Sequence, residues 1–339
     1  MTPDFLQAIQ PDLDNACRLL RKRNARLVGV QLPDGLRTHF RGLCKLIEKR
    51  SGAAAAMLVE MCCGACMAEY HPELDFIIHV AHDRLRPPGK SAGNCSPRKS
   101  RILFIRYAPV MDVEKCVRAA VGMLEPPVGV ITTSTHAGQL PEAMRILEEA
   151  GMRPMAADGK RTGMKAVILG CDFSAAKAIS KKVNSFLFLG SGAFHPVGAQ
   201  IATGKPVVGA DPYDGQARTF TDERDRILRR RFAAIELARG AKMFGVLLGL
   251  YPGQMRKDKA LKVKRLLERN GKDAYLLAAR RFDPESISHL GLEAVVSTAC
   301  SRISFDDQAR YPLPVLSPFE LEIALGMRRW DDYRIDEFA

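Results

Sequence analysis

Short, almost continuous apolar runs recur along the chain, separated by longer stretches in which apolar and charged residues mix. Runs this short, without polar alternation, are typical of strands buried on both faces of a parallel sheet. The pattern predicts strands over 26–32, 55–60, 76–81, 101–107, 128–133, 166–170, 186–190, 206–210, 243–250, 274–279, 293–298 and 312–316.

The stretches between these runs have the apolar spacing of helices. Two of them, 141–151 and 259–271, end in glycine, which commonly follows the last turn of a helix. Strands that alternate with helices indicate βαβ units, so we expect an α/β fold with parallel sheets.

The predicted strands form three groups of four, which suggests three similar Rossmann-like modules of about 100 residues each. The modules are expected at 1–110, 111–215 and 216–339. The third should begin with a long charged helix over 216–242 that links it to the second.

Composition narrows the class of protein. The chain has 339 residues, with 47% hydrophobic and 26% charged residues, as in ordinary globular proteins. It lacks an apolar run of about 18 residues, so no membrane span is expected, and its acidic first residues do not resemble a signal peptide. Nine cysteines, an odd number, fit a reducing cytoplasm better than a disulfide framework. We therefore predict a cytoplasmic protein.

The net charge is +13, and much of the excess lies in two runs that look helical, 224–231 and 256–265. Such runs are either solvated basic faces or docking surfaces for a ribonucleoprotein or translation-factor partner. A zinc-stabilised RNA-binding module is a further alternative. The chain lacks aromatic-rich strand motifs and paired zinc knuckles, so direct nucleic-acid binding is not expected.

Cysteines follow a predicted strand in every module, and in parallel α/β sheets ligands bind beyond the carboxyl ends of strands. These cysteines are Cys62, Cys63 and Cys66 in the first module, Cys171 in the second and Cys300 in the third. The others lie elsewhere: Cys17, Cys44 and Cys116 fall in helical patterns, and Cys95 falls in the Pro-, Gly- and Ser-rich loop 83–100.

Three thiolates, one from each module, could bind three irons of a 4Fe–4S cluster and leave the fourth iron open to a substrate. Two alternatives remain at this point. The cysteines could be unrelated buried residues, or they could bind zinc together with a histidine such as His71 or His82.

Three more loops follow predicted strands and are candidates for ligand contacts. Glycine-containing turns of this kind can present backbone N–H groups to an anion, although most are simply turns. The histidine in the second loop is either a catalytic base or a hydrogen-bonded loop residue. The candidates are Gln31, Asp34 and Gly35 in QLPDGLR, Gly192 and His195 in GSGAFHP, and Gln254 in YPGQMR.

Several stretches together resemble the diphthamide-synthesis family, and in particular its archaeal radical enzymes, the 2-(3-amino-3-carboxypropyl)histidine synthases. They run in family order through residues 26–326. They are QLPDGL, GACMAEYHPELDFIIHVAHDRL, LGCDFSAA, FLFLGSGAFHPVGAQIATGKPVVGADPY, PGQ, ACSRISFDDQ and PLPVLSPFELEIALG.

The resemblance implies three modules arranged around a central 4Fe–4S cluster with Cys66, Cys171 and Cys300 as ligands. Cys62 and Cys63 would then be packing residues, with Gly64 letting the backbone turn Cys66 toward the site. Two positions depart from the family pattern: Cys63 replaces an aromatic residue, and the run 304–308 lacks the usual Trp-Gly.

The implied reaction uses S-adenosyl-L-methionine. One electron would cleave the bond between its sulfur and the Cγ of its methionine part, releasing methylthioadenosine and a 3-amino-3-carboxypropyl radical. The radical would add to C2 of a histidine on translation elongation factor 2. The archaeal form implies a homodimer that receives electrons from a donor. A quinolinate synthase-like 4Fe–4S enzyme is the nearest alternative.

Overall fold

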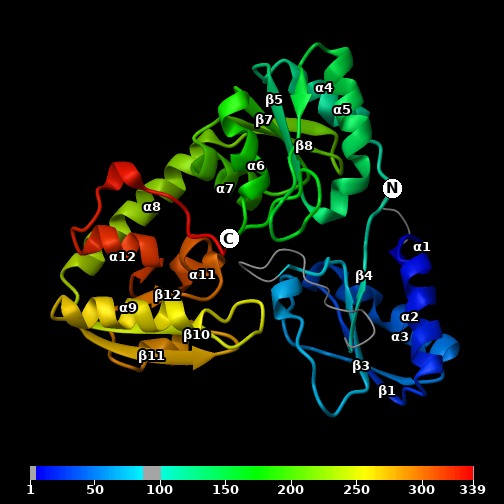
Figure 1. Cartoon of the computed structure of the whole chain (residues 1–339), viewed down its shortest axis with the longest axis horizontal. Coiled ribbons are helices and arrows are strands. Elements are labelled where there is room, and N and C mark those ends of the chain that lie inside the picture. Colours follow the sequence, from blue (N-terminus) through cyan, green and yellow to red (C-terminus); the bar gives the residue numbers. More distant parts are fainter. Residues whose placement is uncertain (1–4, 87–100, 339) are drawn as a thin grey trace. The chain divides into compact units, whose positions relative to one another are not determined.

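The computed structural model describes residues 5–86 and 101–338, in which helices and strands alternate (Figure 1). The strands form three sheets with the orders β2-β1-β3-β4, β6-β5-β7-β8-β9 and β11-β10-β12-β13. In every sheet the first strand lies between the second and the third, and the fourth strand follows the third. This shared order confirms the predicted α/β fold built from similar Rossmann-like modules.

The chain groups into two compact units. One comprises 1–168, 174–191 and 209–218, and the other comprises 169–173, 192–208 and 219–339. The three module boundaries expected from the sequence stay a prediction. Cys95 and most of its loop lie outside the described residues. Among the helices of the described residues, none is long and apolar enough to cross a membrane.

The first sheet is parallel throughout. Alternate residues of its central strands, such as Val28, Val30 and Ile78, pack on one face against Leu13 and Leu43 from two helices. The elements are β1 (Leu27–Gln31), β2 (Ala54–Met57), β3 (Phe76–Val80), β4 (Ile102–Ile105), α1 (Phe5–Ala8), α2 (Gln10–Lys22), η1 (Asp34–His39), α3 (Phe40–Ser51) and η2 (Ala65–Met67).

The second sheet has two central strands that are buried along their whole length. Its elements are β5 (Val128–Thr132), β6 (Pro154–Met155), β7 (Ser185–Leu189), β8 (Val207–Asp211), β9 (Gln216–Thr219), α4 (Glu114–Val121), η3 (Ser134–Gln139), α5 (Leu140–Glu149), α6 (Ser174–Ile179), η4 (Ser180–Lys182) and α7 (Phe194–Thr203).

The strand predicted over 166–170 is wrong. Ala166 has a positive φ of 64°, which interrupts extended backbone, and isolated bridges form there instead of a ladder: a parallel one between Val167 and Thr132 and an antiparallel one between Leu169 and Asp172. The segment nevertheless runs parallel to β5, because the Ile168 N–H donates to the Thr132 carbonyl at 2.9 Å. Cys171 therefore still lies just beyond a chain segment that follows the sheet.

The third sheet is parallel and has apolar residues on both faces. Phe244 and Val246 of β10 face one core, whereas Leu247 faces the other. Such two-sided burial explains the unbroken apolar runs. Its elements are α8 (Thr221–Arg239), β10 (Met243–Gly249), α9 (Lys257–Arg269), β11 (Asp273–Ala279), α10 (Pro284–Ser288), β12 (Ala294–Ser297), α11 (Ser301–Phe305), η5 (Asp307–Arg310), β13 (Val315–Leu316), α12 (Pro318–Ala324) and η6 (Trp330–Asp332).

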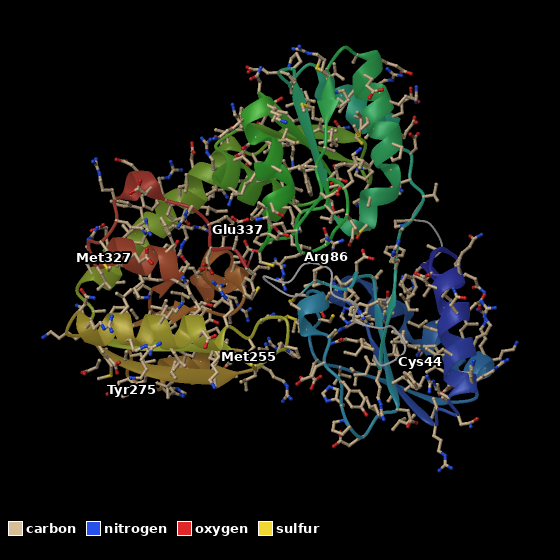
Figure 2. The ribbon with its side chains drawn as sticks, in the orientation of Figure 1. Cys44, Arg86, Met255, Tyr275, Met327 and Glu337 are labelled. Carbon is tan, nitrogen blue, oxygen red and sulfur yellow. The ribbon has the colours of Figure 1, made fainter. Side chains whose placement is uncertain are left out.

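The outer strand β11 exposes apolar side chains. Ala274 packs into the same core as α9, so Tyr275, its neighbour in the strand, points to the opposite side (Figure 2). Tyr275 is 52% exposed, and Leu276 beside it is 38% exposed. The helices of the third module thus leave this edge uncovered.

Helix α8 begins at Thr221, and 216–219 form the short strand β9, so the helix predicted over 216–242 was too long at both ends. Its basic run is only partly a solvated face. Arg226, Arg229 and Arg230 are exposed, whereas Arg231 is 1% exposed.

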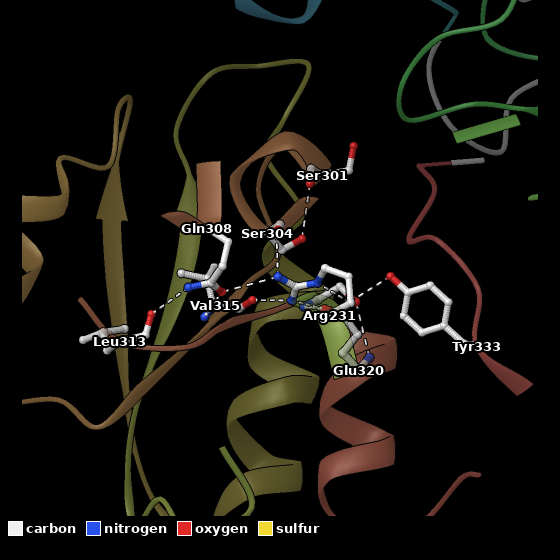
Figure 3. Close-up of polar contacts among 9 residues, drawn as sticks. Arg231, Ser301, Ser304, Gln308, Leu313, Val315, Glu320 and Tyr333 are labelled. Carbon is white, nitrogen blue, oxygen red and sulfur yellow. Dashed lines mark hydrogen bonds and ion pairs between the residues drawn. The ribbon is translucent and has the colours of Figure 1, made fainter. Parts of the chain in front are cut away.

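Arg231 is the centre of a buried polar network (Figure 3). Its guanidinium donates two hydrogen bonds of 2.7 Å to the Glu320 carboxylate, and others to the carbonyls of Ser304 and Val315 at 2.6 and 2.5 Å. Burial alone would raise the pKa of Glu320, but the Arg231 charge lowers it below its usual value. The Tyr333 hydroxyl also donates to Glu320, at 3.0 Å. The network therefore joins α8, α11, β13 and α12.

Replacing Arg231 by Ala would leave the Glu320 carboxylate buried without its partner. We expect the free energy of unfolding to fall by about 3–5 kcal/mol, measured by denaturant titration. As a control, Lys264→Ala removes the partner of the exposed Glu268 in the same unit and should change the midpoint little. A loss below about 1 kcal/mol for Arg231→Ala, the size typical of surface pairs, would contradict a structural role.

Candidate functional site

Cys66 lies in the one-turn helix η2, which follows β2. Its side chain is partly buried, and the next residue, Met67, is buried. Gly64 has a φ of 174°, which any residue can adopt, so the predicted need for glycine flexibility at this position is wrong. A Cβ at Gly64 would lie 3.5 Å from the Cys66 Sγ, so the glycine leaves ordinary contact space beside the thiol.

The loop after β1 contacts the segment that carries Cys66. Buried Gln31 donates from Nε2 to the Met67 carbonyl at 3.5 Å, and Arg37 donates to the Glu60 carbonyl at 2.5 Å. Asp34 is exposed and pairs with Arg37 at 3.0 Å, and within the described part of the chain a Cβ built on Gly35 would meet no atom within 4 Å beyond its own segment. The structure thus places Gln31 beside the first cysteine loop and leaves Asp34 at the surface.

Cys171 occupies a tight turn closed by two backbone hydrogen bonds between Leu169 and Asp172, at 2.9 and 3.0 Å. The carboxyl-terminal residues of the chain hold this turn. The Phe338 N–H donates to the Cys171 carbonyl at 2.8 Å, and Glu337, labelled in Figure 2, accepts from the Phe173 N–H at 2.8 Å.

Cys300 lies three residues beyond β12 and immediately before α11, with an extended backbone (φ −63°, ψ 134°). The residue after it, Ser301, donates its hydroxyl to the carbonyl of Gly170 at 2.9 Å. Gly170 directly precedes Cys171. This hydrogen bond therefore joins the loops of two predicted ligands that are 129 residues apart in sequence (300 − 171).

An aromatic ring packs against the same two loops. A Cβ on Gly170 would lie 2.0 Å from the Phe194 ring, so only glycine allows this approach. The Arg302 guanidinium carbon lies 4.6 Å from the centre of the Phe194 ring, and Phe305 contacts the ring edge-on at 5.8 Å. Sequence reasoning did not select Phe194, which lies in the GSGAFHP loop, as a site residue, and it missed Arg302, although Arg302 lies only two residues after Cys300.

His195 follows Phe194 and is partly buried. Burial, and secondarily the charge of Arg302, lowers the pKa of His195 to about 4, so the imidazole is neutral at physiological pH. Arg302 also pairs with Asp306 at 2.9 Å. Burial raises the pKa of Asp306, with Arg302 acting in the opposite direction. The surroundings of Cys300 thus combine one cation, its carboxylate and a neutral imidazole.

The remaining predicted residues lie in turns. Gly192 has a φ of +80°, a conformation that favours glycine. Gln254 is buried, and a Cβ on Gly249 would lie 3.3 Å from the Gln254 Cβ and 3.0 Å from that of Ala299. Since Ala299 precedes Cys300, the loops after β10 and β12 pack together at this glycine.

A second cluster was not predicted as a set. Donor atoms of Cys62, His79 and His82 lie within 4.8 Å of one another in the first unit. Burial raises the pKa of the Cys62 thiol to about 12 and lowers that of His82 to about 4. For His79, burial and then the nearby His82 lower the pKa to about 3. The available sequence signal was the His-x-x-His spacing at the end of a strand.

Comparison with known proteins identifies the family. Residues 32–334 match a family model described as "Putative diphthamide synthesis protein". The chain belongs to the diphthamide synthesis family. The resemblance seen in the sequence is thereby confirmed, and it leaves the quinolinate synthase-like and zinc–RNA alternatives without support.

Members of this family resemble the chain over most of its length. The 2-(3-amino-3-carboxypropyl)histidine synthase of Pyrococcus horikoshii is 32% identical and aligns over 94% of this chain and 90% of its own. Subunit 1 of the Schizosaccharomyces pombe synthase is 25% identical over 94% of this chain and 74% of its own. The crystal structure of Dph2 from P. horikoshii with a 4Fe–4S cluster has a TM-score of 0.83 at 29% identity, covering 96% of this chain and 93% of that one.

The contact between Gly170 and Phe194 can be tested by substitution. Gly170→Ala would force the ring or the Cys171 turn to move, at a cost of about 1–3 kcal/mol in the free energy of unfolding. We also expect faster alkylation of Cys171, measured by mass spectrometry. The control is Gly240→Ala, where φ is −76° and no described residue beyond the chain neighbours has an atom within 4 Å of the added Cβ. Equal behaviour of the two variants would show that the close approach is unimportant.

Proposed function

We propose that this chain is a 2-(3-amino-3-carboxypropyl)histidine synthase, a transferase that catalyses the first step of diphthamide synthesis. It transfers the 3-amino-3-carboxypropyl group of S-adenosyl-L-methionine to C2 of a histidine on translation elongation factor 2. The observation that carries the proposal is the 32% identity to the Pyrococcus synthase over 94% of the chain.

The residues present fit a 4Fe–4S cluster bound by Cys66, Cys171 and Cys300. All three are cysteines in loops that leave the carboxyl ends of chain segments aligned with parallel sheets, where ligands of such folds bind. The Ser301–Gly170 hydrogen bond supports two of them as a pair. When bound, the cluster supplies an electron and, with three thiolate ligands, an iron with an open position for the methionine part of the substrate.

The chain's own residues hold and shape this site. Ser301 and Phe338 hold the backbone of the Cys171 turn by donating to the carbonyls of Gly170 and Cys171, respectively. The neutral imidazole of His195 offers a hydrogen-bonding group without placing a positive charge beside a cationic sulfonium. Positioning of this kind decides which substrate bond meets the electron donor.

Further substrate contacts are proposed from loop position. Gln31 ends β1, His195 is the second residue of α7, and the others lie in the turns or short helix that follow strands; Gln31 and Gln254 are buried. The proposed contacts are Gln31, Asp34, Gly35, Gly192, His195 and Gln254.

The protein partners are proposed from charge and family. Helix α8 exposes three arginines at helical spacing, Arg226, Arg229 and Arg230, and the chain has a net charge of +13. Such a surface favours docking to acidic regions of the elongation factor, an attraction that salt weakens. We further propose that the chain acts in the cytoplasm as a homodimer supplied by a separate electron donor.

The product of substrate cleavage tests the proposed reaction. Anaerobic, dithionite-reduced protein given S-adenosyl-L-methionine should release methylthioadenosine, and elongation factor 2 of the same source should gain one aminocarboxypropyl group on one histidine. Liquid chromatography with mass spectrometry measures both. Cys300→Ala protein is the control and should yield neither product. Release of 5′-deoxyadenosine as the main product would overturn the proposed bond cleavage.

A further inference from the structure

Three potential metal ligands converge at the carboxyl end of the first sheet. Cys62 lies in the loop after β2, His79 is within β3, and His82 follows that strand by two residues. Their donor atoms lie within 4.8 Å of one another. The side chains of Cys62 and His79 are 2% and 0% exposed, so these groups are enclosed by the fold rather than gathered at its surface.

An unusual backbone conformation brings the two histidines together. Residues three apart in a regular strand point to opposite faces. Ala81 interrupts the extended chain with a φ of +67°, a left-handed conformation that alanine rarely adopts. The chain turns back there, and His82 Nδ1 lies 3.0 Å from His79 Nε2.

A hydrogen bond to Gln31 fixes the orientation of the His79 ring. Gln31 is the register partner of His79 in the β1–β3 pair, and its Oε1 lies 2.7 Å from His79 Nδ1. The Gln31 amide is itself oriented, since its Nε2 donates to the Met67 carbonyl at 3.5 Å. Nδ1 of His79 therefore carries the hydrogen, and the lone pair of Nε2 points toward Cys62 and His82. A histidine that binds a metal usually has such an acceptor behind it.

The position in the sheet is also that of a ligand site. The strand order β2-β1-β3-β4 changes direction between β1 and β3. In open parallel sheets, ligands bind at this switch point, beyond the carboxyl ends of the two strands. Gln31 is the last residue of β1, and His79 and His82 are at the end of β3.

We propose that Cys62, His79 and His82 bind one divalent transition-metal ion of the zinc class, separate from the cluster proposed for Cys66. One thiolate and two imidazoles are ligands that zinc prefers. Ligand atoms in a tetrahedral zinc site are about 3.3–3.6 Å apart, so only small side-chain movements are needed. Binding would replace the thiol hydrogen of Cys62, which leaves as a proton to water, and the hydrogen that His82 Nδ1 shares with His79 Nε2 would move to His82 Nε2, so that both histidines bind as neutral imidazoles.

The ion would have a structural role in the first cysteine loop. Cys62 is four residues before Cys66, and Met67 accepts from Gln31, the residue that orients His79. A metal at this point would anchor the amino-terminal side of the loop to β3. The site does not depend on the function proposed above, because none of its three ligands is among the cluster thiols.

Cobalt binding to the full-length chain tests the site. The host protein carries Cys66→Ala, Cys171→Ala and Cys300→Ala, so that no cluster thiol can take the metal. We expect one Co²⁺ per chain, with the thiolate-to-cobalt charge-transfer band and the visible bands of tetrahedral coordination, and displacement of cobalt by Zn²⁺. Gln31→Leu, which removes the acceptor behind His79, should weaken binding about 10–100-fold.

Matched variants assign the ligands. Adding Cys62→Ser or His82→Gln to the host should abolish the one-equivalent binding, and Cys62→Ser should also remove the charge-transfer band. Adding Cys63→Ser, at the exposed neighbouring thiol, should preserve both. Near-UV circular dichroism reports whether each variant is folded. If a ligand variant loses its native spectrum, cobalt binding by the Gln31→Leu protein, which keeps all three ligands, is compared with that of the host instead. A natively folded host that binds no cobalt, or a band that requires Cys63 rather than Cys62, would overturn the proposal.

Discussion

The direction of parallel strands is the constraint on which this structure depends. In a parallel sheet every strand ends at the same edge, so the loops that follow the strands are brought together whatever their distance in sequence. Three sheets with one shared order apply this constraint three times in one chain. Cysteines placed just after strands are thereby available as ligands, while the strands themselves need only be apolar.

Burial of charge supports this arrangement in the third module. Arg231 and Glu320 form a hydrogen-bonded ion pair inside the core, and Arg231 also donates a hydrogen bond to the Ser304 carbonyl of α11. The Ser304 hydroxyl donates to the Ser301 carbonyl at 3.2 Å, and Ser301 donates to Gly170. A continuous set of hydrogen bonds thus runs from α8 to the turn that carries Cys171. A buried ion pair adds little net stability, but losing one partner is costly, which suits a role in positioning.

Much of the fold could be predicted because strands that are buried on both faces appear in the sequence as short, unbroken apolar runs. The failures have local causes. The run 166–170 is apolar because it is buried beside β5, but the positive φ of Ala166 prevents a ladder. Arg231 belongs to a basic run that looked solvated, and only the fold reveals the buried Glu320 that pairs with it.

The candidate site also has a part that the sequence predicts and a part that it does not. Placement after strands pointed to the cysteine loops, and family resemblance then selected Cys66 among three neighbours. The His-x-x-His spacing is the one sequence signal for His79 and His82, but strand periodicity places the two residues on opposite faces, and their convergence depends on the conformation of Ala81, which the sequence does not indicate. The packing of Phe194 on Gly170 joins residues 24 apart (194 − 170), a distance beyond any local pattern.

The assignment of Cys66, Cys171 and Cys300 as the three cluster ligands is the central claim. Iron and sulfide counts with the anaerobic absorption spectrum test it most directly in a set of alanine variants. We expect Cys66→Ala, Cys171→Ala and Cys300→Ala each to lose the intact 4Fe–4S spectrum, and the double variant Cys62→Ala/Cys63→Ala to retain most of its iron and sulfide. A double variant without a cluster, together with a Cys66→Ala protein that keeps one, would contradict the account.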